Sequence, residues 1–396
     1  MSSGAGASAP SGSGSRGAPT LRAVGTYFLG LGTVGFGGPV VLVERMRRDF
    51  HEVRGWCTTG EFKEGLALAQ LAPGPLAAQL AIYLGWVRGG IVGAAVSGAG
   101  FVLPSFLMVL AISAAYVRFG GLPWMQGAFY GVGAAVIAVI ASSAWRLARK
   151  TVGSDWLLWG VVAVNAVVTA WTEAEVLSLF VASGLVVVVV RAIPRVPPAA
   201  AAAIMIPAWL VTGLHGAASW PTLLRLAGFF AKAGTVVFGS GLAIVPFLHG
   251  GVVQQTHWLT ERQFLDAVAV SMITPGPVVI TVVFIGYLVA GPLGACAAAL
   301  GVFLPTYLAV VLVARWFHRV AQSPQLRAAV DGVTAAATGA IIGAAIVLGR
   351  RALVDATAVL LFLAALGIVL RAKQVPEPVL MLAAGLAGMG LRGPAA

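Results

Sequence analysis

Long apolar stretches alternate with short charged stretches along most of the chain. After a polar start come thirteen apolar segments, each about as long as a helix needs to cross or enter a bilayer. Their approximate bounds are 23–43, 64–84, 91–117, 127–147, 155–171, 175–191, 199–217, 224–249, 265–290, 292–314, 328–349, 353–370 and 377–391. Charged connectors lie at 44–54, 146–150, 191–195, 315–327, 350–351 and 371–377. The pattern predicts an all-α polytopic membrane protein.

Residues 1–20 consist mainly of Gly, Ser, Ala and Pro and show no apolar periodicity. This composition predicts a disordered N-terminal tail. The apolar run typical of a signal peptide is missing before residue 21. We therefore expect the first apolar segment to act as an uncleaved insertion signal.

The run Ala72-Pro73-Gly74-Pro75 recurs 202 positions later as Thr274-Pro275-Gly276-Pro277. Proline removes an amide donor and glycine loosens the backbone, so an uninterrupted membrane helix gains nothing from this run. Many more residues align at the same shift, or one position less after a deletion, among them Thr33 with Thr235, Phe36 with Phe238, Trp56 with Trp258, Phe62 with Phe264, Pro104 with Pro305 and Gly131 with Gly332. Aligned Trp, Pro and Gly are hard to obtain by chance between apolar stretches. We infer an internal duplication, with a first repeat at 21–195, a linker with a connecting transmembrane segment at 196–222, and a second repeat at 223–394.

The orientation of the repeats follows from the number of segments and from the charges. Six segments fall in each copy and one between them, so the second copy is inverted if all thirteen cross, as in many secondary transporters. With the N-terminus inside, that arrangement places the arginine-rich connector 44–63 outside, against the positive-inside rule. If the Gly-Gly-Pro and Pro-Gly-Pro segments of each copy instead enter and leave by one face, 44–63 becomes cytoplasmic and the copies stay inverted. We favour this arrangement of about nine full spans and four re-entrant hairpin segments over up to 13 spans, although Arg350-Arg351 remains outside as an exception.

Composition supports the membrane assignment and removes other classes. Hydrophobic residues make up 59% of the chain and charged residues 10%, compared with about 25% charged in soluble domains. Mean hydropathy is +0.94. The net charge of +12 is spread over connectors, which is a topology signal rather than a nucleic-acid surface. The expected surroundings are therefore a lipid bilayer, with no nucleic-acid partner.

Broken helices within a bilayer leave backbone groups without partners, which is tolerable only beside protein or a watery cavity. Proline suits the first helical turn, so Pro39 and Pro75 are expected to begin half-helices whose positive ends point at the glycines. Four such starts, two from each membrane face, predict one anion-binding volume near the bilayer midplane. The alternative is that the motifs only kink or closely pack ordinary helices. The candidate substrate-binding residues in these motifs are Gly37, Gly38, Pro39, Pro73, Gly74, Pro75, Gly239, Ser240, Gly241, Thr274, Pro275, Gly276 and Pro277.

Lys232 stands inside an apolar segment, just before the second glycine break, and aligns with Gly30. An ammonium group within the membrane is costly and usually faces a cavity or a partner. We therefore include Lys232 among the substrate-binding candidates. The alternative is that its side chain extends to the membrane interface.

Four further polar residues are candidates for the pathway or for ion coupling. Gln70 and Gln79 flank the first Pro-Gly-Pro run. Glu64 and its aligned residue Asp266 begin the two Pro-Gly-Pro segments and are able to carry protons. The alternative for these carboxylates is a helix N-terminus, where the dipole favours negative charge.

Signatures of enzymes, metal sites and nucleotide hydrolysis are absent from the sequence. There are no paired carboxylates within apolar segments, no metal-type spacing of His and acidic residues, and no Gly-Lys-Ser/Thr phosphate loop. Cys57 and Cys296 form neither a disulfide framework nor a metal pair. We therefore expect no catalytic residues, no metal and no cofactor.

The combined motifs resemble the chromate transporter family, and in particular its long-chain, two-domain members. They are the two Phe-Gly-(Gly/Ser)-(Pro/Gly) runs, Trp56 to Phe62 leading to Gln70-Leu71-Ala72-Pro73-Gly74-Pro75, and Trp258 to Phe264 leading to Pro275-Gly276-Pro277. The resemblance covers residues 21–392. It implies a plasma-membrane secondary transporter that exports chromate, by antiport or under the membrane potential, and confers chromate resistance.

There are two departures from the family pattern, of which the first bears on the substrate and the second is a divergence of the kind that asymmetric ion coupling requires. Apolar Val40, Val41 and Leu42 stand where the pattern often has Gln or His, and the second copy has Ser240-Gly241 in place of Gly-Pro. Sulfate or another tetrahedral oxyanion, moving in either direction, is therefore the alternative substrate. A homodimer is left open.

Overall fold

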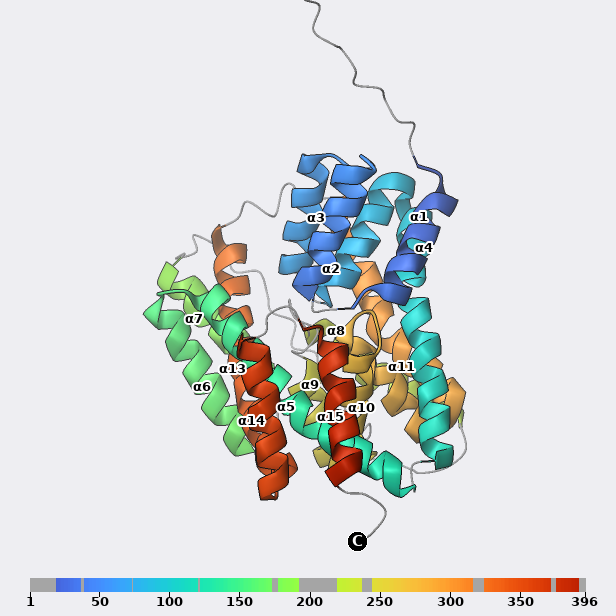
Figure 1. Ribbon diagram of the computed structural model, residues 1–396. Coiled ribbons are helices and arrows are strands. Elements are labelled where there is room, and N and C mark those ends of the chain that lie inside the picture. Colours follow the sequence, from blue (N-terminus) through green and yellow to red (C-terminus); the bar gives the residue numbers. More distant parts are fainter. Residues whose placement is uncertain are drawn as a thin grey trace, which may run out of the picture.

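The computed structural model describes residues 19–36, 39–72, 74–119, 122–172, 177–191, 219–236, 244–315, 324–371 and 375–391. In these ranges every regular element is a helix (Figure 1). The first repeat contains α1 (Leu21–Val34), α2 (Pro39–Met46), η1 (Arg47–Val53), α3 (Thr59–Leu71), α4 (Leu76–Phe119), α5 (Pro123–Val152), α6 (Trp156–Thr172) and α7 (Leu177–Arg191). The second contains α8 (Trp220–Val236), α9 (Ile244–Leu248), η4 (His249–Gln255), α10 (Glu261–Ile273), η5 (Val278–Ile280), α11 (Thr281–Ala314), α13 (Pro324–Ala352), α14 (Ala356–Arg371) and α15 (Glu377–Leu391). Residues 1–18 of the predicted tail and the connecting segment at 199–217 lie outside the described residues.

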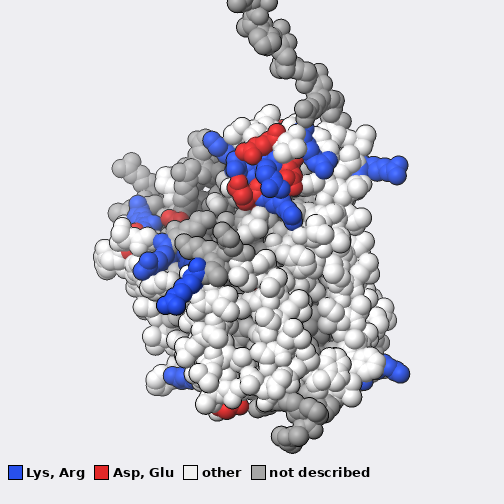
Figure 2. All heavy atoms as spheres, in the orientation of Figure 1, with Lys and Arg blue, Asp and Glu red and all other residues white. Residues whose placement is uncertain are grey.

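Four helical stretches are long and apolar enough to cross a membrane, namely Leu76–Phe119, Trp124–Arg149, Val278–Ala314 and Ala328–Ala352. Shorter apolar helices accompany them, and large apolar side chains such as Val167, Leu300 and Leu386 are exposed along their outer faces. Figure 2 shows the Lys, Arg, Asp and Glu side chains of the visible face gathered at the top, at the left edge and at the bottom, while uncharged residues cover most of the area between them. The prediction of an all-α polytopic membrane protein is confirmed.

The first hairpin of the first repeat consists of α1 and the stretch formed by α2 and η1. After α1 the chain turns back, and the ring of Phe50 lies 5.6 Å from that of Tyr27 and 5.7 Å from that of Phe28. The second repeat has a matching aromatic pair, since Tyr27 and Trp56 (6.3 Å) align with Phe229 and Trp258 (5.5 Å), and Phe229 also lies 5.5 Å from Phe247 in α9. Both hairpins are therefore held together by aromatic side chains.

The second hairpin runs through α3, the Pro-Gly-Pro turn and the first arm of α4. Gln79 Nε2 donates to Ala72 O (3.1 Å) near the turn, and Arg88 pairs with Glu61 (2.6 Å) at the open end. The chain then reverses again at Gly89–Gly90, where the backbone leaves the helical region, and continues as the second arm of α4. In α11 the equivalent reversal falls at Ala290–Gly291.

Many local features recur at the spacing that the sequence predicted. Thr58 with Glu61 and Thr260 with Gln263 form capping boxes at the starts of α3 and α10. The π-helical stretches η1 and η4 also correspond, as do the positive φ angles of Gly74 and Gly276. In Figure 1 the hairpins of the first repeat gather at one end and α8 to α10 lie farther toward the other. The domain bounds and the inverted membrane orientation stay predictions.

The charged stretch 44–54 is mostly helical, rather than the simple connector that its composition indicated. The reason is a set of ion pairs on the helix surface, in which Arg47 bonds to both Glu44 and Glu52. Arg350-Arg351 is the exception to the positive-inside rule in the favoured topology. The charge of Arg351 is balanced locally, because its guanidinium pairs with Glu261. His249 Nε2 lies 2.8 Å from the same carboxylate.

The orientation of the repeats is testable with the matched residues Val53 and Gln255, which are both exposed. Each is changed to cysteine in a chain whose natural Cys57 and Cys296 are replaced by alanine. We expect Val53→Cys to react with a membrane-impermeant maleimide only from the cytoplasmic side and Gln255→Cys only from outside. Labelling of both from one side would refute the inversion, and labelling of Val53→Cys only from outside would refute the re-entrant hairpins.

Candidate functional site

A small cavity lies where half-helix starts from both repeats meet. Its lining consists of Pro39 and Leu42 in α2, Pro75, Leu76 and Ala77 at the start of α4, and Gly276, Pro277 and Val278 before α11. Three of the four predicted half-helix starts are therefore brought together. The fourth, at residues 237–243, lies outside the described residues.

Backbone contacts between the repeats close this cavity. Gly276 N donates to Gly35 O over 3.0 Å, which joins the second Pro-Gly-Pro turn directly to the break after α1. Gly276 has φ of +105°, and a Cβ atom at this position would overlap the side chain of Ser105 in α4. Only glycine combines this backbone conformation with so close an approach.

The first Pro-Gly-Pro turn has the mirrored contact. Gly74 has φ of +136°, and a Cβ atom there would lie 2.8 Å from Thr306 Cγ2 in α11 and 2.7 Å from Gln79 Nε2. Ser105 and Thr306 are aligned residues, because each follows the aligned proline of its long arm. Each Pro-Gly-Pro turn therefore packs against the long arm of the other repeat.

The polarity of the cavity comes from the backbone. The eight lining residues include no charged side chain. The first amides of a helix have no partner within the helix, and they stand at the positive end of its dipole. Ser105 Oγ, behind Gly276, is buried without a hydrogen-bond partner in the described part of the chain. The lining therefore contains no side-chain carboxylate that would repel an anion.

The cavity is nearly closed in this conformation. Its volume is about 10 Å³, which is room for about one water molecule. A ligand larger than water therefore requires the hairpins to move apart. The Gly276–Gly35 hydrogen bond is one of the contacts that hold the hairpins together in this conformation.

The other predicted residues differ in their relation to the cavity. Pro275 and Thr274 are buried, but the Thr274 hydroxyl donates to Val270 O of its own helix (3.0 Å). Gln70 and Lys232 are exposed and Glu64 is partly exposed, and none of these three lines the cavity. Gly37, Gly38, Pro73, Gly239, Ser240 and Gly241 lie outside the described residues. The sequence prediction missed Ser105 and Thr306, which the aligned Pro104 and Pro305 could have indicated.

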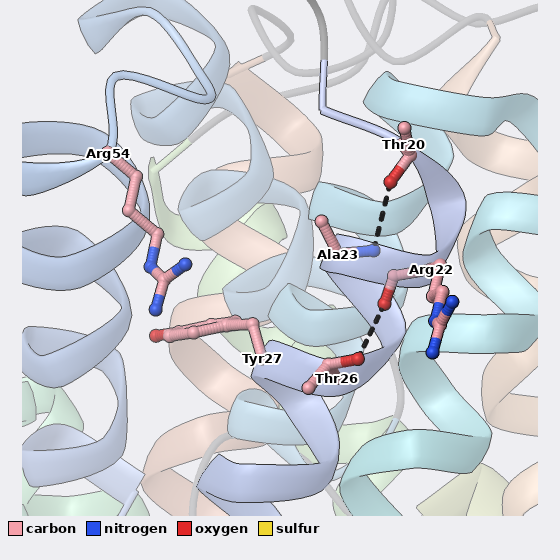
Figure 3. A pocket seen from close by; sticks show the side chains of 6 residues that line it. All are labelled: Thr20, Arg22, Ala23, Thr26, Tyr27 and Arg54. Carbon is pink, nitrogen blue, oxygen red and sulfur yellow. Dashed lines mark hydrogen bonds between the residues drawn. The ribbon is translucent and has the colours of Figure 1, made fainter.

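A second, larger cavity opens at the end of α1 where the chain enters the helix (Figure 3). Its volume is about 420 Å³, and Thr20, Arg22, Ala23, Thr26, Tyr27 and Arg54 line it. The Arg54 guanidinium carbon lies 5.2 Å from the centre of the Tyr27 ring. Neither arginine forms an ion pair with a carboxylate of the described residues. We call this cavity the basic pocket.

Apolar outer faces, helical hairpins and a cavity between them define a multi-pass membrane transporter. The chain belongs to the chromate transporter family, whose sequence model, described as "Chromate transporter", matches residues 22–204 and 224–389. This confirms the resemblance, and it makes the protein a transporter rather than an enzyme. Localisation in the plasma membrane as a multi-pass protein agrees with both findings.

Individual relatives match over nearly their whole length. The "Chromate transport protein" of Cupriavidus metallidurans is 57% identical over 93% of each chain. The "Probable chromate transport protein" of Synechococcus elongatus is 51% identical over 93% of this chain and 95% of the relative. The "Chromate transport protein" of Pseudomonas aeruginosa is 32% identical over 91% and 90%. No solved structure matches the chain significantly.

Proposed function

We propose that this protein exports chromate from the cytoplasm, confers chromate resistance, and binds the anion near the bilayer midplane through half-helix N-termini. The observation that carries the proposal is the meeting of half-helix starts from both repeats at one cavity without charged side chains. The names of relatives that match over more than nine-tenths of the chain support chromate as the substrate.

The chemistry of the cavity suits a tetrahedral oxyanion. Chromate carries two negative charges on four oxygens, all of which accept hydrogen bonds. Backbone amides at helix starts donate such bonds without the full positive charge that would hold the anion too tightly to release. The glycines allow the anion to approach the backbone closely.

The membrane potential favours export over uptake. Moving one elementary charge across 100 mV involves about 2.3 kcal/mol. For a dianion leaving a cell that is negative inside, the same potential contributes about 4.6 kcal/mol in the outward direction. Export therefore needs no nucleotide hydrolysis, in agreement with the missing phosphate loop.

The test of this function uses everted membrane vesicles, in which export appears as uptake. Vesicles that contain the protein are expected to accumulate labelled chromate faster than vesicles that lack it, and to do so when the interior is made positive. Sulfate, which has the same shape and charge, is measured in parallel. Accumulation of sulfate without chromate would overturn chromate as the substrate, and uptake only into right-side-out vesicles would overturn export.

The basic pocket provides a separate prediction about the approach of the anion. In the favoured topology it faces the cytoplasm, where Arg22 and Arg54 raise the local concentration of anions. We expect Arg54→Gln to raise the KM for chromate roughly threefold to tenfold and to weaken its salt dependence, with kcat unchanged. Arg118→Gln, at the other end of α4, is the matched control. A change in kcat with unchanged KM would contradict this role.

A further inference from the structure

Asp266 is a carboxyl group buried at the contact between the two repeats. It lies in α10, is 4% exposed, and accepts a hydrogen bond at Oδ2 from the hydroxyl of Tyr116 in the second arm of α4 (2.6 Å). The tyrosine ring is itself fixed between Phe129 and Phe284, at 5.3 and 5.1 Å. This geometry holds the donor in one position against the carboxylate.

No cation among the described residues forms an ion pair with this carboxylate. In the described part of the chain Asp266 forms no ion pair within 4.0 Å. The titratable groups that act on it are Tyr116, from α4, and Arg262, which lies one turn earlier on α10 and is exposed. A buried carboxylate with a single neutral donor is a group that exchanges a proton readily, because burial disfavours its charged form.

The groups around Asp266 suit the binding of a proton better than the binding of a metal ion. Among the described residues no cluster of three or more His, Cys, Asp or Glu could hold a metal ion. Glu64, which aligns with Asp266, is only partly buried. The two copies have therefore diverged, so that the second copy contains the enclosed carboxyl.

The Tyr116–Asp266 hydrogen bond joins two elements that lie next to the central cavity. Tyr116 is on the arm of α4 that also presents Ser105 to Gly276. Asp266 is on α10, which leads directly into the second Pro-Gly-Pro turn. A hydrogen bond to a charged carboxylate is about twice as strong as one between neutral groups. Protonation of Asp266 therefore weakens the attachment of α10 to α4.

We propose that Asp266 binds the proton that is exchanged for chromate, and that its protonation loosens α10 from α4 so that the central cavity can open. The inference rests on the proposed export function. In the favoured topology Asp266 lies about 7.5 Å along α10 from its outer end, at 1.5 Å per residue, so the proton enters from outside. One proton moves in as one chromate dianion moves out, and no covalent bond other than O–H forms or breaks.

The test uses the full-length protein in liposomes that hold a pH-sensitive dye and unlabelled chromate inside, with labelled chromate outside. Wild-type protein is expected to move protons with chromate when a pH gradient is imposed. Asp266→Asn is expected to exchange labelled for unlabelled chromate but to lose both the proton movement and the stimulation by the pH gradient. Glu52→Gln, which changes an exposed carboxyl, is the matched control.

Tyr116→Phe separates the proton-binding role from a structural one. It keeps the carboxyl, so coupled proton movement persists, but the pH profile of transport shifts toward higher pH because the charged form has lost its donor. If Asp266→Asn fails to reach the membrane, this variant decides, and an unchanged pH profile overturns the inference.

The outcomes also distinguish the inference from the function beneath it. Wild-type protein that moves neither chromate nor sulfate refutes the proposed function. Wild-type protein that moves chromate without protons, or an Asp266→Asn variant that still responds to the pH gradient, refutes the role of Asp266 and leaves chromate export standing.

Discussion

Leucine in place of Gly276 is expected to abolish transport while the protein still inserts into the membrane. The position has φ of +105°, lines the central cavity, and leaves no room for a Cβ atom beside Ser105. A side chain here both strains the backbone by about 1–3 kcal/mol and fills the volume in which we propose that the anion binds. Gly74→Leu, with φ of +136° and Thr306 as the obstructing neighbour, is expected to have the same effect.

The measurement compares chromate transport in everted vesicles with the amount of protein in the same membranes. Gly228→Leu is the matched control, because a Cβ atom at Gly228 meets nothing within 4 Å. A reciprocal change of size tests the contact itself, since Gly276→Ala should lose transport and Ser105→Gly in the same chain should restore part of it. Wild-type transport by both leucine variants would remove the cavity from the mechanism.

The alignment of the two copies was sufficient to predict half of the residues that line the cavity. Pro39, Pro75, Gly276 and Pro277 were chosen from the sequence because broken helices recur at one spacing, and the structure brings them together. The break between the apolar segments 64–84 and 91–117 was equally visible, and it falls at the Gly89–Gly90 reversal. These features are local, so the residue types that produce them stand next to one another in the chain.

Contacts between distant segments were not predictable in the same way. Apolar periodicity indicates which face of a helix is buried but not which residue lies opposite, so the pairing of Tyr116 with Asp266 was out of reach. The same holds for Ser105 against Gly276. Thr274 shows a second reason why the sequence is insufficient. A threonine hydroxyl can face a cavity or bond to its own helix, and the sequence does not distinguish the two. In the structure it donates to the backbone carbonyl of Val270.

Glycine also serves assembly in this fold, at sites away from the cavity. The two arms of α4 cross at Gly85 and Gly93, where a Cβ on either residue would overlap the backbone of the other. The arms of α11 cross in the same way at the aligned Gly286 and Gly294. Small residues at such crossings allow close packing of membrane helices, for which the surrounding lipid gives no hydrophobic drive.

Gly85→Leu and Gly286→Leu are therefore expected to remove the protein from the membrane rather than to inactivate it in place. A leucine must push the arms apart along their shared face, and overpacking of this kind costs about 1–3 kcal/mol or more. Membrane abundance and the thermal melting of detergent-solubilised protein measure the effect, with Gly160→Leu, where a Cβ meets nothing within 4 Å, as the control. Normal abundance and melting of both variants would contradict the packing role. Gly276→Leu should show the opposite result, with the protein present in the membrane and transport absent. Together, the two experiments therefore separate glycines needed for folding from glycines needed for transport.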